Sequence, residues 1–386
     1  MDLSYTTEQD AFRAEVRAWL TANVPRNIGS PGTAEGFAQH RRWERTLSDA
    51  GYGGIKWPVE YGGRGADVVT QAIFEEEYLA AGGPERVTLL GQKLMAPTLM
   101  EHGSDEQKRR WLPRILSAED IWSQGFSEPG AGSDLAAIRT KGERSGDDLV
   151  LNGQKIWTSY GAFADWIFVL CRTDPAAERH NGITFIAVEM STDGVDARPI
   201  VQLDGHAGFA EVFFTDARVP ASNVVGDVND GWRVAMTTLG AERDSPPRSA
   251  TRYLKDLRTL VDICEQNGIA DDAAVADELA KLYVEAKCYA IATDRVVSRI
   301  ANGEDVGPDA SVMKLQWSEL ERRMYETGLD LLGPRAAALD EAGADFWHNY
   351  WYARAATIYA GTSEIQRNIV SERILGLPRE PRGDSR

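Results

Sequence analysis

The sequence has few of the features that mark disulfide-linked, secreted or membrane proteins. Its 386 residues include only three cysteines, Cys171, Cys264 and Cys288, with no C-x-x-C spacing, as is typical of a reducing compartment. No apolar run approaches the roughly 20 residues that a membrane-spanning helix needs. The first residues also lack the basic and apolar regions of a signal peptide. These absences predict a soluble, cytoplasmic protein.

Positive charge is also scarce. The formal net charge is −17 at pH 7, from 42 Lys and Arg against 59 Asp and Glu. Nucleic-acid phosphates and anionic membranes both repel an acidic surface, so neither is expected as a partner. An anionic ligand must then be bound by a local group of donors.

Motifs for several common chemistries are missing. The histidines show no metal-ligand spacing such as H-E-x-x-H, and no G-x-S-x-G marks a serine nucleophile. The segment "GAGSDL" lacks the third glycine of a dinucleotide fingerprint and no βαβ unit surrounds it. The sequence therefore predicts no metal site. Its five histidines are scattered along the chain, at His40, His102, His180, His206 and His348.

What the chain does contain is a regular change of periodicity. The first third is helical by period, beginning at the capping box Thr6-x-x-Gln9. From about Ile121 the pattern becomes that of strands, and helical period returns at "GWRVAMTTLGAERD". We expect an N-terminal helical domain at 1–120, a central β-domain at 121–226, and a C-terminal helical domain at 227–386 that ends in a short disordered tail.

Within the β-domain, "LVLNGQKIWTS" alternates apolar and polar residues around Asn152-Gly153. Asn-Gly is the strongest short hairpin signal, so the pattern predicts a turn at these two residues. The strand that follows the turn carries Trp157, Thr158 and Ser159. An aromatic ring beside hydroxyl groups can flank a flat cofactor, although Trp157 can equally be a core residue.

A turn-rich loop precedes that strand pair. It spans Gln124 to Thr140 and carries Ser127, Gly130, Gly132 and Ser133. Glycine allows close approach of the backbone to a ligand, and the hydroxyl and N–H groups can hold a phosphate or a heterocycle. The alternative is an ordinary loop that joins a helix to a strand.

Two further segments suggest chemistry. Glu242 continues an apolar helical stripe through Trp232, Ala235, Met236 and Leu239, and a carboxylate held among apolar groups has a raised pKa suited to a general base. Alternatively, Glu242 is exposed or paired with Arg243. Near the C-terminus, Thr362, Ser363 and Gln366 predict a capped helix start, whose free N–H groups suit an anion.

Three ordered motifs together resemble the acyl-CoA dehydrogenase family. They are "SEPGAGSD" at 127–134, "LNGQKIWTS" at 151–159, and "IYAGTSEIQRN" at 358–368 followed by "ERILGLPR". The implied fold is α+β but mainly α, with an N-terminal helical domain, a central β-barrel-like domain and a C-terminal four-helix bundle.

The resemblance also implies a reaction and a cofactor. Family members remove the α-proton of an acyl-CoA thioester and transfer the β-hydride to FAD, giving a 2-enoyl-CoA. The implied substrate contacts are Ser133, Arg243, Gly361 and the backbone N–H of Ala360. The implied FAD contacts are Gln124, Phe126, Ser127, Gly132, Ser133, Trp157, Ser159, Thr362 and Glu364.

The position of the base identifies a branch of the family. Many members place the catalytic glutamate immediately before the Gly-Thr of the C-terminal turn, where this chain has Ala360. Members similar to isovaleryl-CoA dehydrogenases use instead a glutamate before an arginine on the first bundle helix, and Glu242-Arg243 matches that pair. The resemblance therefore assigns Glu242 as the base and implies a branched or bulky acyl group.

Two departures concern assembly. The segment "CEQNGIADDAAVADEL" lacks an arginine that in homotetrameric relatives reaches the neighbouring subunit's FAD, and "LLGPRA" replaces a Gly-Gly motif. A similar pattern occurs in heteromeric members that act on sterol-derived CoA thioesters. The expected partners are thus an acyl-CoA, an electron-transfer flavoprotein or other acceptor, and either further copies in a homo-oligomer or a paralogous subunit in an α2β2 heterotetramer.

Two alternatives remain on sequence grounds. The same fold also supports flavin-dependent monooxygenases and oxidases, which often lose the base. A non-catalytic partner subunit would lack both glutamates, whereas this chain lacks only the one at position 360.

Overall fold

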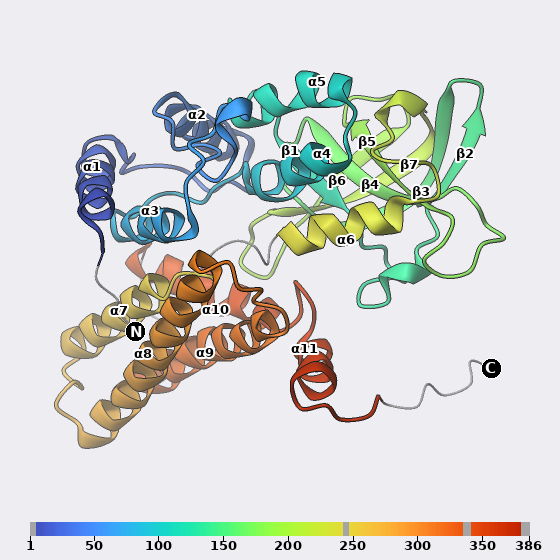
Figure 1. Ribbon diagram of the computed structural model, residues 1–386. Coiled ribbons are helices and arrows are strands. Elements are labelled where there is room, and N and C mark those ends of the chain that lie inside the picture. The colour runs from blue at the N-terminus through green and yellow to red at the C-terminus, as the bar shows by residue number, and fades with distance from the viewer. Residues whose placement is uncertain (1–4, 242–246, 335–340, 380–386) are drawn as a thin grey trace. The chain divides into compact units, whose positions relative to one another are not determined.

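A computed structural model of the chain describes residues 5–241, 247–334 and 341–379 (Figure 1). Its contacts divide the chain into two compact units. Unit 1 consists of Met1–Asn23, Asp67–Gly82 and Ser245–Arg386, and unit 2 consists of Val24–Ala66 and Gly83–Asp244. From position 380 onward, the predicted disordered tail lies outside the described residues.

In the described residues of unit 1 every regular element is a helix. In it α9 packs against α7, α8 and α10, which gives the predicted four-helix bundle (Figure 1). Large side chains such as Tyr253, Tyr289 and Met324 fill its core. The helices of this unit are α1 (Thr7–Asn23), α3 (Val68–Ala80), α7 (Thr251–Gln266), α8 (Ala273–Ala301), α9 (Asp309–Leu332), α10 (Glu341–Ala356) and α11 (Ser363–Ile369).

The predicted capping box at the start of α1 is present. The backbone N–H of Gln9 donates to Thr6 Oγ1 at 3.2 Å, and the Gln9 side chain accepts from the Thr6 N–H at 3.0 Å. Both bonds satisfy donors that a helix start leaves free. Further along α1, Arg13 and Arg17 bind the buried Glu77 of α3 at 2.8 and 2.7 Å, so the two helices are joined by charge as well as by apolar packing.

Unit 2 combines helices with a sheet. Its helices are α2 (Ala34–Asp49), α4 (Ala96–His102), α5 (Asp105–Leu116) and α6 (Gly231–Ala241). Trp111 of α5 packs edge-on against Trp122 and Trp166, with ring centroids 5.5 Å apart in each pair. The side chain of Gln107 donates to the carbonyls of Ser222 and Val224 at 2.8 and 2.7 Å, which attaches α5 to the segment after the last strand.

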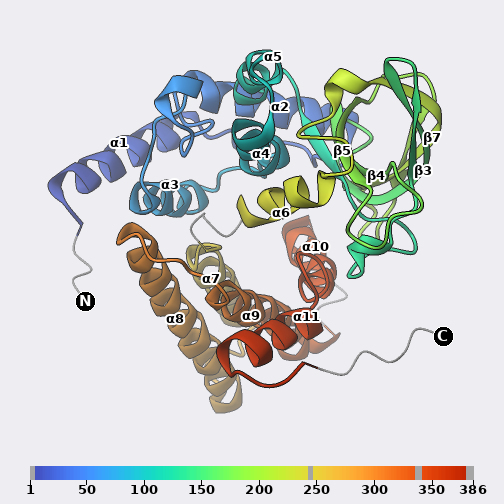
Figure 2. The ribbon, with the colours of Figure 1, turned by 45° about the vertical axis from the view of Figure 1, so that its right-hand side comes forward.

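In the part of the chain that the structure describes, seven strands form one mixed sheet with the order β1-β4-β2-β3-β7-β6, and β5 pairs with β4. In Figure 2 the strands curl around a common interior. Apolar side chains such as Ile167, Val169 and Val212 fill that interior, as the predicted β-barrel-like domain requires. The strands are β1 (Trp122–Gly125), β2 (Lys141–Ser145), β3 (Asp148–Ser159), β4 (Trp166–Arg172), β5 (Ile183–Glu189), β6 (Val195–Ile200) and β7 (Phe209–Pro220).

The hairpin predicted at Asn152-Gly153 is wrong. The strand β3 continues through these residues, and the turn lies at Gly146-Asp147, between the paired residues Ser145 and Asp148. A register shift against β7 occurs between Leu151 and Gly153. Asn152 and Gly153 therefore form part of a β-bulge, in which glycine accommodates the irregular backbone.

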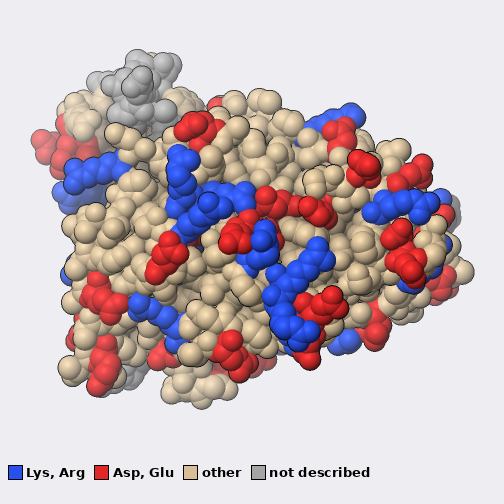
Figure 3. Space-filling model, turned by 90° about the horizontal axis from the view of Figure 1, so that it is seen from above, with Lys and Arg blue, Asp and Glu red and all other residues tan. Residues whose placement is uncertain are grey.

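The surface mixes both signs of charge. On the face that carries α5, basic and acidic side chains are interspersed, so neither sign covers that face (Figure 3). On α5 itself, Arg114 pairs with Glu119 at 2.8 Å and with Asp120 at 2.7 Å. Among the described helices, none combines the length and the apolar character needed to cross a membrane.

Candidate functional site

The candidate cofactor loop of unit 2 follows β1 directly. Gln124, in β1, pairs with Phe168 of β4, and Phe126 is 5% exposed with its ring edge-on to Phe168 at 5.6 Å. Phe126 is thus a core residue whose side chain anchors the loop. Beyond it Ser127 is half-buried, whereas Gly132 and Ser133 are exposed.

The end of β3 presents Trp157 to solvent. Trp157 is 57% exposed and has a left-handed backbone with φ of 59°. Such a φ is rare for a bulky residue, and it accompanies a second irregularity in the β3–β7 pairing between Lys155 and Thr158. The indole ring lies nearly perpendicular to the ring of Phe209, with centroids 6.1 Å apart, and much of the indole is open to solvent. The core alternative for Trp157 is wrong.

Two hydrogen bonds join these two segments. The N–H of Ile156 donates to the Ser127 carbonyl at 3.0 Å, and the Ser123 hydroxyl donates to the Ser159 carbonyl at 2.7 Å. Ser127 therefore lies beside Ile156 and next to Trp157, whereas Ser159 lies beside Ser123 at the start of β1.

A buried ion pair that the sequence analysis missed links the same segments. Lys155 Nζ lies 2.7 Å from Glu128 Oε1, with the lysine side chain fully buried and the glutamate side chain 8% exposed. Burial raises the pKa of Glu128, but the charge of Lys155 and the hydrogen bonds from Lys155, Thr140 and Arg139 together hold that pKa below the ordinary value of 4.5. The sequence did contain a sign of this ion pair. Lys155 stands at an inward position of a predicted strand, after the apolar Leu149 and Leu151, which are buried.

The loop and the end of β3 leave room for a flat ligand. At Gly130 and Gly132 no described atom beyond the adjoining residues lies within 4 Å of the place where a Cβ would stand, so the backbone is open to close approach. The exposed ring of Trp157 offers a stacking surface beside it. The residues of unit 2 therefore suit a heterocycle and its phosphate groups.

The C-terminal turn of unit 1 contains the second group of predicted residues. Ala360 has a left-handed backbone with φ of 53°, and Gly361 follows with φ of 87°. A Cβ on Gly361 would lie 2.5 Å from the side-chain nitrogen of Gln366, which donates to the Ala360 carbonyl at 3.1 Å. The left-handed backbone favours glycine at 361, and the carbonyl of residue 360 is held by the Gln366 side chain of α11.

The predicted helix start at Thr362 is confirmed. Thr362 Oγ1 accepts from the N–H of Ile365 at 3.2 Å, and Gln366 is buried. Glu364 is exposed in the first turn, where its own backbone N–H and the Thr362 hydroxyl lower its pKa. Ser363 is buried, and its hydroxyl has no hydrogen-bond partner within the described part of the chain.

Charged groups that the sequence analysis did not single out support this turn. Lys314 of α9 is buried and donates to the carbonyl of Ala356, the last residue of α10. A cation suits the negative end of a helix dipole. Arg248 donates to the hydroxyl of Tyr359 at 3.4 Å and to Glu321 at 2.7 Å.

The predicted base and its neighbour, Glu242 and Arg243, lie outside the described residues. The helix that precedes them, α6, ends at Ala241 and is confirmed as a helix. On the predicted stripe, Ala235 is fully buried, whereas Met236 is 40% exposed. The apolar face is therefore only partly buried within unit 2.

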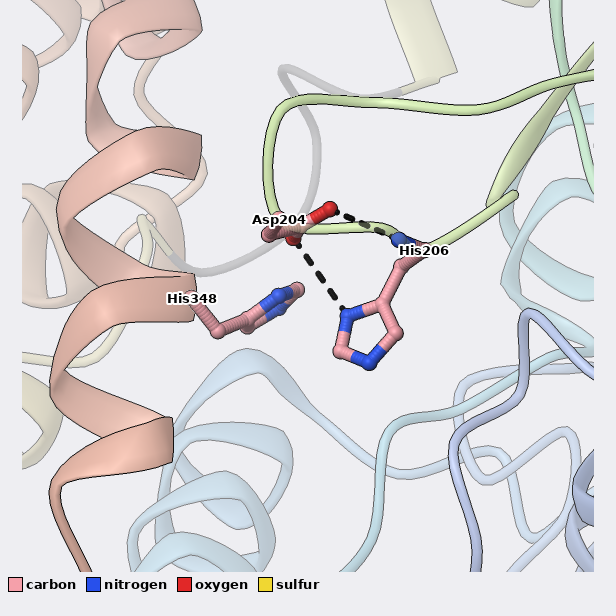
Figure 4. Close-up of side chains that lie close together, drawn as sticks. All are labelled: Asp204, His206 and His348. Atoms are coloured by element: carbon pink, nitrogen blue, oxygen red, sulfur yellow. Dashed lines mark hydrogen bonds and ion pairs between the residues drawn. The ribbon is translucent and has the colours of Figure 1, made fainter. Parts of the chain in front are cut away.

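The loop before β7 holds one of the five histidines. Asp204 accepts a hydrogen bond from the backbone N–H of His206 at 2.9 Å, and its other oxygen lies 3.3 Å from His206 Nδ1 (Figure 4). This is a local turn of the kind in which aspartate binds the backbone two residues ahead. The contact shapes the loop that leads into β7.

Comparison with known proteins agrees with this architecture. Residues 6–119, 123–217 and 229–375 match the N-terminal, middle and C-terminal domains of acyl-CoA dehydrogenases. The acyl-CoA dehydrogenase IpdE1 of Mycobacterium tuberculosis is 41% identical over 97% of this chain and 99% of that protein. The IpdE1 of Mycolicibacterium smegmatis is 42% identical over 97% of this chain and 100% of that protein.

Solved structures give the same result. The Tcur3481-Tcur3483 steroid ACAD has a TM-score of 0.88 and 31% identity, covering 98% of this chain and 100% of that one. The ChsE4-ChsE5 complex from Mycobacterium tuberculosis has a TM-score of 0.85 and 31% identity, with the same coverage. The chain belongs to the acyl-CoA dehydrogenase family, whose members are flavin-dependent oxidoreductases.

Proposed function

We propose that this chain is the base-bearing subunit of an FAD-dependent dehydrogenase that converts a bulky, steroid-derived acyl-CoA to its 2-enoyl-CoA. The observation that carries the proposal is the exposed ring of Trp157 on the strand segment that pairs with Ser123 and Ser127, beside an open, glycine-containing loop. This arrangement supports a flat cofactor against the end of β3. The family membership of the chain supports FAD as that cofactor.

The residues of unit 2 divide into two roles in this proposal. Trp157 stacks on the ring system, and Ser159 donates a hydrogen bond to the edge of the ring. Ser127, Gly132, Ser133 and the backbone at Gln124 and Phe126 hold the remainder of the cofactor. FAD, when bound, supplies the acceptor for the hydride that leaves the β-carbon of the substrate.

The C-terminal turn contributes to the binding of both molecules. The backbone N–H of Ala360 donates to the thioester carbonyl, which makes the α-proton more acidic, and Gly361 allows the thioester to approach closely. Thr362 and Glu364 contact the cofactor from the start of α11. The left-handed backbone of residue 360 supports this role, because it sets the direction of that N–H.

Glu242 removes the α-proton, and Arg243 contacts the substrate beside it. The side chain at position 360 is a methyl group, so the turn offers no carboxylate for this step. A base on the first bundle helix leaves room beside residue 360 for a branched or fused-ring acyl group. The likeness to proteins named as steroid acyl-CoA dehydrogenases supports a steroid-derived substrate.

A paralogous subunit completes the assembly in this proposal, as an α2β2 heterotetramer. The likeness to the ChsE4-ChsE5 complex supports a heteromer, and so does the absence from the sequence of the arginine and Gly-Gly motif of homotetrameric relatives. Electrons pass on to an electron-transfer flavoprotein or another soluble acceptor.

Anaerobic flavin reduction by a panel of acyl-CoAs tests the proposal. The chain is purified alone and with the paralogous protein from a neighbouring gene, and both preparations are mixed with straight-chain and fused-ring acyl-CoAs. The expected result is rapid bleaching of the flavin absorbance by fused-ring substrates in the heteromer alone. Stoichiometric FAD binding and turnover by the isolated chain would contradict the heteromer, and oxygen consumption without an added acceptor would favour an oxidase.

The base is tested by Glu242→Gln, with Glu265→Gln as the matched control because Glu265 is an exposed helical glutamate of α7. Loss of a general base lowers the rate by about 10²-fold or more, so E242Q should bind FAD but reduce it at least that much more slowly. The control should reduce it at the native rate. Reduction by E242Q at the native rate would refute the assignment.

A further inference from the structure

Lys155 carries a charge in the interior of unit 2. Its side chain is fully buried in β3, and its ammonium makes two hydrogen bonds: one to Glu128 Oε1 at 2.7 Å and one to the Phe126 carbonyl at 3.2 Å. Both acceptors belong to the loop that follows β1. Lys155 therefore holds the first residues of the candidate cofactor loop against β3.

Glu128 holds the far end of the same loop. Its two carboxylate oxygens accept the backbone N–H groups of Arg139 at 2.6 Å and Thr140 at 2.9 Å. Glu128 also exchanges backbone hydrogen bonds with Ala131 at 2.9 and 3.0 Å, which closes a tight turn. One carboxylate thus fastens the loop where it leaves β1 and where it approaches β2.

Lys155 also lies two residues before Trp157 and four before Ser159 on the same strand. The irregular pairing that turns Trp157 outward begins at Lys155. Through its hydrogen bonds the Lys155 ammonium therefore connects the strand end that carries Trp157 to the loop that carries Ser127, Gly132 and Ser133.

Stability alone does not explain this pair. Burying two charges has a desolvation free energy that apolar side chains do not have. Proteins in which a buried ion pair is replaced by apolar residues of similar size are often as stable as the native protein. An apolar side chain at position 155, however, makes no hydrogen bond to the Phe126 carbonyl, and one at position 128 makes none to the two N–H groups. What the charged pair provides is a single geometry for the loop.

We infer that Lys155 and Glu128 are positioning residues that clamp the loop 126–140 in its cofactor-binding shape. They act through the backbone of that loop, and neither has to touch the cofactor. The inference rests on the proposed function for the identity of the ligand, FAD. The shape of the loop itself is a property of the chain that can be measured without any ligand.

The test uses the double variant E128Q/K155M, which removes both charges and so leaves neither buried alone. The matched control is D196N/R198M, which removes an ion pair of 2.7 Å in β6 whose side chains are more than half exposed. Each protein is prepared in its native assembly, with the partner subunit where one is required. Circular dichroism verifies that the variants are folded.

Two measurements are made on each protein. Hydrogen–deuterium exchange without FAD follows peptides that cover 126–140, with peptides from β4 and β5 as the internal reference. Quenching of flavin fluorescence on titration gives the dissociation constant for FAD. Since a hydrogen bond to a charged group changes an equilibrium by a factor of about ten or more, E128Q/K155M should show about tenfold faster loop exchange and about tenfold weaker FAD binding. The control should match the native protein in both.

Native exchange rates across 126–140 in the folded double variant would overturn the inference, as would native FAD affinity. If the double variant does not fold, E128D decides instead, because it keeps the charge but shortens the side chain. Faster exchange confined to 126–140 in E128D supports the clamp, and native exchange there overturns it. Failure of the native assembly to bind FAD overturns the proposed cofactor, whereas the exchange result still measures the clamp.

Discussion

Arg248 and Glu321 form an ion pair of 2.7 Å inside the helical bundle of unit 1, where the glutamate side chain is only 1% exposed. Arg252 reaches the other carboxylate oxygen at 3.1 Å. The guanidinium of Arg248 also lies over the ring of Trp317, 4.4 Å from its centroid. One carboxylate of α9 therefore holds two arginines from the segment that begins α7, and Arg248 in turn bonds Tyr359 beside the C-terminal turn.

Glu321→Gln should destabilise the protein strongly. Removing one partner of a buried pair leaves the opposite charges without compensation, at a cost of about 3 kcal/mol. The matched control is Glu319→Gln on the same helix, whose carboxylate is 33% exposed and pairs with Arg322 at 3.2 Å and with Arg367 at 3.3 Å. Each such partly exposed pair contributes less than about 1 kcal/mol. Urea denaturation followed by circular dichroism compares the two, and equal midpoints would contradict the special role of Glu321.

Trp157→Ala should weaken FAD binding with little effect on folding. The ring is 57% exposed, so its removal leaves no cavity in the core. The lost aromatic contact corresponds to roughly 1 kcal/mol, or about fivefold in the dissociation constant for FAD. Trp157→Phe keeps an aromatic face and should bind FAD nearly as the native chain does. A tenfold or greater loss with W157F, or none with W157A, would argue against stacking.

Ala360→Val and Ala360→Gly should act in opposite directions. The backbone at 360 is left-handed, which glycine adopts without strain and a β-branched residue adopts at a cost of about 1–3 kcal/mol. The valine variant should therefore have a lower thermal midpoint, and the glycine variant should equal or exceed the native one. Differential scanning calorimetry makes the comparison, and a valine variant as stable as the glycine variant would show that the turn adapts.

His102 should make the α4–α6 contact sensitive to pH. Burial and the nearby Arg233 lower its pKa below the ordinary value of 6.5, although Glu101 opposes the shift. The folded protein thus holds His102 neutral, 2.8 Å from the Thr237 hydroxyl, while the unfolded chain takes up a proton near pH 6.5. Because the unfolded state then binds more protons, stability is full above that pH and falls as the pH is lowered through it.

The substitution His102→Gln keeps a hydrogen-bonding side chain and removes the titration. The native chain should lose stability relative to H102Q as the pH falls from about 7 to about 5, since histidine changes charge in this range. Thermal midpoints measured across that range give the comparison. Parallel curves for the two proteins would exclude His102 as the source of the pH dependence.

The order of elements could be predicted from the sequence because it depends on local periodicity. The helix at Thr7–Asn23 follows from apolar spacing and a capping box whose two hydrogen bonds are formed by residues three apart. The start of α11 at Thr362 is local in the same way. The three family motifs also lie in single short segments, so their resemblance required no knowledge of the fold.

The hairpin error and the missed ion pairs have a common cause, because each depends on contacts between segments that lie far apart in the sequence. Asn152-Gly153 carries a local turn signal, but pairing with β7 keeps the strand extended through it. Lys155 and Glu128 are 27 residues apart, and Arg248 and Glu321 are 73 apart.

Periodicity along the chain thus predicts the order of the helical and strand segments, and the motifs give the residue types of the candidate site. The exposure of Trp157, the burial of Phe126 and the contacts of Lys155 with the loop appear only in the folded chain. Burial and charge pairing depend on which distant segments meet, and periodicity carries no information about those meetings.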